Sequence, residues 1–203
     1  MSTRTDLVNR VLNDDLKRTD VSTAVDSAVT SAIKHYNRER WWFLEAVAET
    51  TTSSSQAYYV VPPDMKKMDN LLITISGSKV PLDLVSYDEI DNEDDGRFFG
   101  QPVKVAMYQD SLRLSPVPNG AYVITMSYHR KLDESTTGSV SNSWTNEGFD
   151  LIRYRAAYDV AKHTLRNRDL ALGFKEDETD TYHQMVKENI GRISTGQISR
   201  SQW

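Results

Sequence analysis

The spacing of hydrophobic residues changes twice along this chain, from helical to alternating and back to helical. Between Asp20 and about Arg40, apolar residues recur three and four positions apart, which predicts an amphipathic helix. A shorter helix before it is expected to begin at Thr5 or Asp6 and to end at Asp14-Asp15. Two helices are predicted near the C-terminus, with apolar stripes formed by Phe149, Ile152, Ala156, Val160 and Ala161 and by Tyr182, Met185, Val186, Ile190 and Ile193.

The middle of the chain alternates apolar and polar residues in short runs between turn residues, which is typical of strands. Strands are predicted over residues 44–48, 58–61, 71–75, 80–84, 103–108, 112–114 and 122–128. Gly77 suits a hairpin turn between the third and fourth of them. Ser86 followed by Glu89 resembles a capping box, which predicts a short helix through Ile90.

These patterns predict an α+β fold, in which N-terminal and C-terminal helices form a bundle that carries a β-rich central insertion. The expected parts are N-terminal helices over 1–43, a β-rich section over 44–131, C-terminal helices over 132–190 and a flexible tail over 191–203. The Ser/Thr/Asn/Gly-rich stretch from Leu132 to Trp144 is expected to be an exposed connection. No internal repeat is evident in the sequence.

The composition argues against several classes of protein. A net charge of -5 gives no general attraction to DNA phosphates or anionic membranes. The absence of cysteine excludes disulfides, thiolate nucleophiles and cysteine-ligated zinc. No apolar run approaches the roughly 20 residues of a membrane span, and the first six residues lack the apolar core of a signal peptide. We therefore expect a soluble protein that stays where it is made.

No motif in the sequence indicates a catalytic, cofactor or metal site. There is no P-loop, no GxGxxG motif and no serine in a GxSxG elbow. The four histidines lie far apart in sequence, and none has HExxH spacing. The acidic loop from Asp91 to Asp95 resembles the first half of a calcium loop, but Pro102 occupies the twelfth position, where a bidentate Glu is needed. We therefore predict no catalytic residue, no cofactor and no metal.

The aromatic residues Trp41, Trp42 and Phe43 mark the junction between the helical and β-rich parts. Such a cluster could stack nucleic-acid bases, but base stacking is usually accompanied by basic residues along the same surface, and only Arg38 and Arg40 are nearby. Packing in the core or at a subunit contact is favoured. We therefore interpret these three residues as a structural junction.

A series of short motifs follows in a fixed order along the chain. They are Trp41-Trp42-Phe43-Leu44, Tyr58-x-x-Val61-Pro62-x-Asp64, Gly100-x-Pro102, Leu112-x-Leu114-x-Pro116-x-Pro118, Tyr128 and the helix with Leu151-Ile152-x-x-x-Ala156. In this order and spacing they resemble the head-to-tail adaptor (connector) proteins of tailed phages, closest to those of short-tailed phages. The resemblance covers roughly residues 20–190. Val61 departs from it where such proteins often have Leu, and Val103-Lys104-Val105 replaces a more aromatic sequence.

The resemblance implies a structural virion protein at the head–tail junction, made in the host cytoplasm and not an enzyme. Such a protein forms a homo-oligomeric ring, commonly of twelve copies, that binds the portal protein after DNA packaging and receives the tail or nozzle protein. DNA is expected to pass through the channel without specific binding, and no membrane partner is expected. A closed ring with heterologous contacts needs two complementary surfaces on each subunit, which the helical and β-rich parts can supply.

In the family pattern, the C-terminal segment reaches the portal. Arg192 and Arg200 supply charged donors, while Ile193, Ile198 and Trp203 supply apolar anchors. A segment of this composition has too few contacts to fold alone, and we predict that binding to the portal orders it.

The alternative function is that of a phage-associated cell-wall glycan hydrolase. Such an enzyme needs two carboxylates across a substrate cleft, and Glu45, Glu49, Asp64 and Asp83 are possible members of the pair. The sequence cannot pair them. Glu45 and Glu49 are more simply the exposed face of a strand, and Asp64 is more simply a turn residue.

Overall fold

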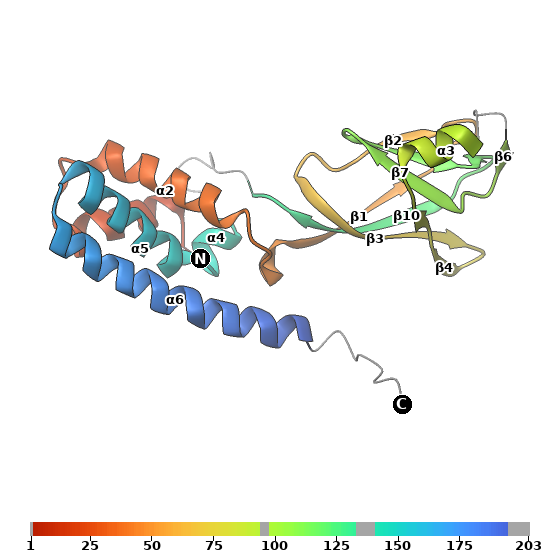
Figure 1. Ribbon diagram of the computed structural model, residues 1–203. Helices are drawn as coiled ribbons and strands as arrows, with labels where there is room; N and C mark the ends of the chain where they lie inside the picture. The colour runs from red at the N-terminus through yellow and green to blue at the C-terminus, as the bar shows by residue number, and fades with distance from the viewer. Residues whose placement is uncertain (1, 94–97, 133–140, 195–203) are drawn as a thin grey trace. The chain divides into compact units, whose positions relative to one another are not determined.

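The computed structural model describes residues 2–93, 98–132 and 141–194 (Figure 1). The chain divides into two compact units. The first, here called the helical unit, combines Met1–Leu44 with Leu132–Trp203, and the second, the β-rich unit, is Glu45–Lys131. Each unit has a hydrophobic core of its own.

The helical unit is built from helices of both ends of the chain (Figure 1). Its elements are α1 (Arg4–Arg10), the π-helical turn η1 (Val11–Asp15), α2 (Ser22–Tyr36), the 3-10 turn η2 (Trp42–Leu44), α4 (Ser143–Asn146), α5 (Phe149–Asp159), the π-helical turn η3 (Val160–Thr164) and α6 (Arg168–Ser194). Helix α5 packs against both α2 and α6. Ala32 of α2 and Ala156 of α5 are buried, and such small side chains let helix backbones approach closely.

Helix α1 begins earlier than the sequence pattern predicted. Thr3 is its N-cap: the Thr3 hydroxyl accepts a hydrogen bond from the Asp6 amide at 3.1 Å, and the Asp6 carboxylate accepts one from the Thr3 amide at 2.8 Å. This reciprocal pair satisfies two backbone donors that a helix start would otherwise leave without partners. The prediction placed the start at Thr5 or Asp6, so it missed the capping box by two to three residues.

The turn between α1 and α2 has an unusual hydrogen-bond pattern. After η1, the amide of Leu16 donates to the carbonyl of Val11 at 2.9 Å, and the amide of Arg18 donates to the carbonyl of Leu12 at 2.9 Å. Lys17 between them has a φ of 52°, in the left-handed region that helix ends commonly use.

The turn between α5 and α6 repeats this pattern. The amide of Leu165 donates to Val160 at 2.9 Å, the amide of Asn167 donates to Ala161 at 2.9 Å, and Arg166 has a φ of 53°. Valine begins both π-helical turns and leucine follows both. The helical unit therefore contains two hairpins with one turn geometry, a local repeat that the sequence alone did not reveal.

In the described residues, the β-rich unit contains ten strands in three sheets. The first sheet has the order β1 (Glu45–Thr51), β10 (Val123–Arg130), β3 (Met65–Ile75), β4 (Ser78–Pro81). The second has the order β2 (Tyr58–Val60), β8 (Ser111–Ser115), β7 (Lys104–Tyr108), β5 (Asp83–Leu84), and the third pairs β6 (Phe99–Gly100) with β9 (Val117–Pro118). Helix α3 (Tyr87–Glu93) packs against β7.

The register of the strands places apolar side chains of two sheets in one core. Ile73 of β3 lies opposite Ile124 of β10, and Val105 of β7 lies opposite Leu114 of β8. All four side chains are buried in the same cluster. Because successive side chains of a strand point to opposite faces, this register leaves the alternate residues on the outer faces of the sheets.

The sequence correctly predicted the turn after β3 and the helix after β5. Ser76 and Gly77 have φ values of 50° and 82°, and such paired positive values belong to the tight turns that connect hairpins. The Ser86 hydroxyl accepts a hydrogen bond from the Glu89 amide at 3.2 Å, at the start of α3.

The predicted fold class, an α+β helical bundle with a β-rich insertion, is wrong. Helices take up 46% of the described residues and strands 28%, and the strands form several sheets in a large unit that also contains a helix. The fold is therefore mixed and is not a simple bundle of N- and C-terminal helices. Strands of two residues such as β5, β6 and β9 show no alternation, so the sequence could not reveal their sheets. Within the described residues, no helix is long and apolar enough to cross a membrane.

Candidate functional site

The predicted structural junction lies in an aromatic cluster of the helical unit. Trp41 is only 1% exposed, and its ring centroid lies 6.2 Å from that of Trp144 on α4 and 6.0 Å from that of Tyr182 on α6. The Trp41 indole N–H donates to the Tyr36 carbonyl at 3.1 Å, and the Trp144 indole N–H donates to the Asn37 side chain at 2.8 Å. Both indoles therefore combine a buried ring with a satisfied donor, and they join α2, α4 and α6.

Trp42 holds the last turns of α6. The Asn189 side chain accepts a hydrogen bond from the Trp42 amide at 2.9 Å and donates one to the Arg40 carbonyl at 2.8 Å. The guanidinium of Arg192 lies 4.6 Å from the Trp42 ring centroid and pairs with Glu188 at 2.6 Å. We call Trp42, Asn189 and Arg192 the α6 clamp, because they fix the helix from which the C-terminal residues continue.

The structure places only part of the predicted portal-binding tail. Arg192 and Ile193 belong to α6, which extends to Ser194. Ile198, Arg200 and Trp203 lie outside the described residues, as does part of the acidic loop between Asp91 and Asp95. Residues 133–140 of the predicted connection also lie outside them.

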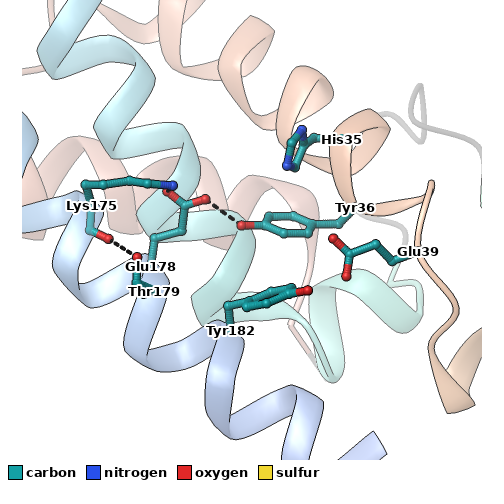
Figure 2. A pocket seen from close by; sticks show the side chains of 7 residues that line it. All are labelled: His35, Tyr36, Glu39, Lys175, Glu178, Thr179 and Tyr182. Carbon is teal, nitrogen blue, oxygen red and sulfur yellow. Dashed lines mark hydrogen bonds and ion pairs between the residues drawn. The ribbon is translucent and has the colours of Figure 1, made fainter.

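A cavity of about 170 Å³ lies beside a buried carboxylate of α6 (Figure 2). Figure 2 shows the side chains that line it: His35, Tyr36, Glu39, Lys175, Glu178, Thr179 and Tyr182. The Glu178 side chain is 3% exposed. It accepts hydrogen bonds from the Tyr36 hydroxyl at 2.5 Å, from the Lys175 ammonium at 2.9 Å and from the Arg155 guanidinium at 3.2 Å. Side chains from three helices, α2, α5 and α6, thus donate hydrogen bonds to one carboxylate.

The electrostatics of this cluster fit a structural role. Burial raises the pKa of Glu178. The hydrogen bonds from Tyr36, Lys175 and Arg155 together lower this pKa by more than burial raises it, so the net pKa is below its ordinary value. Burial and the Glu178 carboxylate raise the pKa of Tyr36 far above its ordinary value. Glu178 is therefore ionised and Tyr36 neutral. A general base works best with a pKa near the working pH, and Glu178 is shifted the wrong way for that role.

The four carboxylates of the hydrolase alternative are distributed over the β-rich unit. Glu45 and Glu49 are exposed on β1, and Glu49 accepts a hydrogen bond from Thr125 at 3.1 Å. Asp64 accepts one from the Tyr128 hydroxyl at 3.1 Å. Asp83 is exposed in the short strand β5 of the second sheet. This distribution gives no support to a catalytic pair.

Within residues 2–93, 98–132 and 141–194, no group of three or more His, Asp or Glu side chains is arranged to hold a metal ion. Asp91, the first residue of the predicted non-binding acidic loop, forms an ion pair with Arg113 at 2.5 Å.

The sequence interpretation missed Glu178 and Asn189. A signal for Glu178 exists, because Ala171, Phe174 and Met185 are buried on α6 at helical spacing and Glu178 lies on the same stripe. A carboxylate on an apolar stripe indicates a buried charge that needs partners. Asn189 carries no comparable signal, since its partners are backbone groups 147 and 149 residues away.

The family model described as SU10 adaptor protein matches residues 2–202, which is nearly the whole chain. No curated protein matches the sequence. The family match confirms the resemblance to phage head–tail adaptors that the order of the motifs indicated.

Proposed function

This chain belongs to the SU10 adaptor protein family, and we propose that it forms a ring that binds the portal protein of a phage after DNA packaging and attaches the tail. A structural adaptor role in a bacteriophage follows from the family itself. The observation that carries the finer proposal is the extent of the match, which spans both the helical and the β-rich unit.

A ring of identical subunits is supported by the organisation of the chain. Heterologous contacts require two different complementary surfaces on each subunit. Two units with separate cores can present two such surfaces without either unit losing its own packing. We propose twelve copies. The net charge of -5 suits a channel through which DNA passes without specific binding, because attraction to phosphates needs clustered Lys and Arg.

The C-terminal segment is the proposed portal-binding element. The α6 clamp holds the base of this segment on the helical unit through Asn189 and Arg192. Ile198, Arg200 and Trp203 follow in the sequence and supply the proposed apolar and charged contacts. In a ring, weak docking of each copy becomes strong attachment, because neighbouring copies raise the effective concentration.

Cosedimentation with portal rings of the same phage tests the proposal. The full chain is expected to sediment with the rings, whereas a chain that ends at Ser194 is expected to keep its melting temperature and to lose most of its binding. The deletion leaves Arg192 in place, so the α6 clamp stays intact and only the segment itself is tested. Equal cosedimentation of both chains would show that the segment is not the portal-binding element. Release of soluble fragments from purified peptidoglycan would instead favour the hydrolase.

A further inference from the structure

A basic cavity adjoins the turn between α5 and α6. Its volume is about 330 Å³, and it is lined by Tyr158, Lys162, Arg166, Arg168, Ala171 and Leu172. The Lys162 ammonium donates to the Tyr158 hydroxyl at 2.8 Å and lies 5.2 Å from the centroid of the ring. Arg155 and Lys175 each lie 5.6 Å from the same centroid. Tyr158 is therefore surrounded by positive charge.

Not all of these cations are neutralised within the chain. Arg155 pairs with Asp159 at 3.7 Å and with Glu178 at 3.2 Å, and Lys175 pairs with Glu178 at 2.9 Å. Within the described part of the chain, Lys162, Arg166 and Arg168 form no ion pair with a carboxylate. All three are exposed and line the basic cavity. Lys162 donates to Tyr158 and also interacts with the nearby Asp159 carboxylate, so Arg166 and Arg168 are the charges most available to a ligand.

The equivalent turn between α1 and α2 shows that the fold does not require this charge. There, Arg10 pairs with Asp14 at 2.8 Å and Arg18 pairs with Asp20 at 2.6 Å. Asp15 of the same turn pairs with Arg153 of α5 at 2.5 Å. The positions of Asp14 and Asp15 are occupied by His163 and Thr164 in the second hairpin. With one backbone geometry, the first turn pairs Arg10 and Arg18 with aspartates and leaves Lys17 exposed, whereas the second exposes Lys162, Arg166 and Arg168.

We propose that the basic cavity is a docking site for an acidic segment of a partner protein, with an Asp or Glu side chain next to an apolar one. The guanidinium forks of Arg166 and Arg168 suit carboxylates, which they can bind in a bidentate manner. The remaining wall is apolar: Leu172 is 52% exposed beside Ala171 and the Tyr158 ring.

A nucleic acid fits this cavity less well. Its phosphates could contact the arginines, but they bring no aliphatic group to cover Leu172. A chain with a net charge of -5 also repels a long polyanion outside this one patch. Charge complementarity together with the apolar wall therefore favours an acidic protein segment.

The basic cavity adjoins the N-terminal end of α6, whereas the proposed portal-binding segment follows its C-terminal end. Helix α6 has 27 residues, which corresponds to a length of about 40 Å. A partner bound at the cavity would therefore be held apart from the α6 clamp. The chemistry of the basic cavity does not depend on the proposed adaptor function.

A binding experiment with blocked synthetic peptides tests the docking site. The probes are LDLEL and its neutral counterpart LNLQL, titrated into the full chain and followed through backbone amide shifts by NMR. We expect LDLEL to shift the amides of residues 158–172 in a saturable way and LNLQL to shift none of them. Combined Arg166→Asn and Arg168→Gln changes should weaken the binding of LDLEL at least about tenfold. Asn is chosen because it tolerates positive φ.

The first hairpin supplies the matched control. Combined Lys17→Asn and Arg18→Gln changes also remove two cations at an equivalent turn, and they should leave the affinity for LDLEL unchanged. Equal weakening by both pairs of changes would mean that net charge alone matters and would overturn the proposal. So would unchanged binding by the Arg166/Arg168 variant, or saturable binding of a duplex of about 20 base pairs at lower concentration than LDLEL. Loss of self-association in that variant, without loss of LDLEL binding, would assign the cavity to a second copy instead.

Discussion

The two helical hairpins have the same turn geometry but differ in their charged side chains. Both turns follow a π-helical segment, both place a non-glycine residue at a φ near 50°, and both bury the valine that begins the π-helical segment. The first turn is rich in aspartates that pair with nearby arginines, whereas the second exposes three cations that line one cavity with Tyr158. The residues that the two turns share, such as the buried valine, specify the backbone conformation. The charged side chains differ between the turns without changing that conformation, so they are free to serve the binding of a partner.

The largest expected effect comes from the aromatic cluster that both hairpins depend on. Trp41→Ala should lower the free energy of unfolding by about 3 to 5 kcal/mol, because it empties a fully buried site and removes a satisfied indole donor. Trp42→Ala is the control, and it should cost about 1 kcal/mol because its ring is half-buried. Urea denaturation measures both. Equal costs would mean that Trp41 is not the centre of the shared core.

The second effect concerns Glu178, which lies between the cluster and the basic cavity. Glu178→Gln should cost about 3 kcal/mol, because Arg155 and Lys175 lose a buried partner. The pKa of Glu178 is lowered by folding, so its contribution is complete above its ordinary value of 4.5 and is lost as the pH falls below it. Thermal melts between pH 3 and pH 7 should show a steeper acid decline for the wild type than for the variant, and parallel curves would contradict the assignment.

A third pair of changes tests the difference between the turns at one equivalent position. Asp15→Ala should cost about 2 kcal/mol, because Asp15 is 6% exposed and its loss leaves Arg153 half-buried without its main partner. Thr164→Ala should change the stability by less than about 0.5 kcal/mol, because Thr164 is exposed. If both changes cost the same, the ion pair does not distinguish the hairpins.

How much of the fold the sequence could predict depends on how far apart in the sequence the interacting residues lie. The α2 and α5 helices, the Ser76-Gly77 turn and the α3 start follow from local periodicity and turn chemistry, and all appear in the structure. The sheet arrangement depends on pairings between distant segments, such as β1 with β10, and short strands leave no periodic signal. The repeat of the turns was also missed, because only a valine, a leucine and an aspartate recur at the same spacing in the two stretches.

Candidate sites were likewise predictable where the signal is local and were missed where distant segments come together. Trp41, Trp42 and Phe43 were interpreted as packing in the core or at a subunit contact; Trp41 is buried in the core of the helical unit, and Trp42 and Phe43 are partly buried against it. Glu178 and its three donors come from helices that are 142 and 23 residues apart in the sequence, so their convergence becomes visible only in three dimensions. The basic cavity escaped notice because Lys162, Arg166 and Arg168 are interspersed with neutral residues in the sequence and gather only at the turn.

The smallest expected effect tests whether the two turns share their backbone geometry in solution. Lys17→Gly and Arg166→Gly should each stabilise the protein by about 0.5 kcal/mol, because glycine adopts positive φ without the steric penalty of a side chain. Thermal melts of the two variants should shift in the same direction and by similar amounts. Opposite shifts would show that the turns differ.

Electron microscopy of portal rings mixed with the purified full chain is the most direct test of head–tail adaptor function. A ring-shaped layer should be added to one face of the portal, with a regular number of subunits, twelve in the form proposed here. The chain that ends at Ser194 provides the comparison on the same grids and should leave most portals bare. Portal rings that stay unchanged in the presence of excess full chain would contradict the adaptor function.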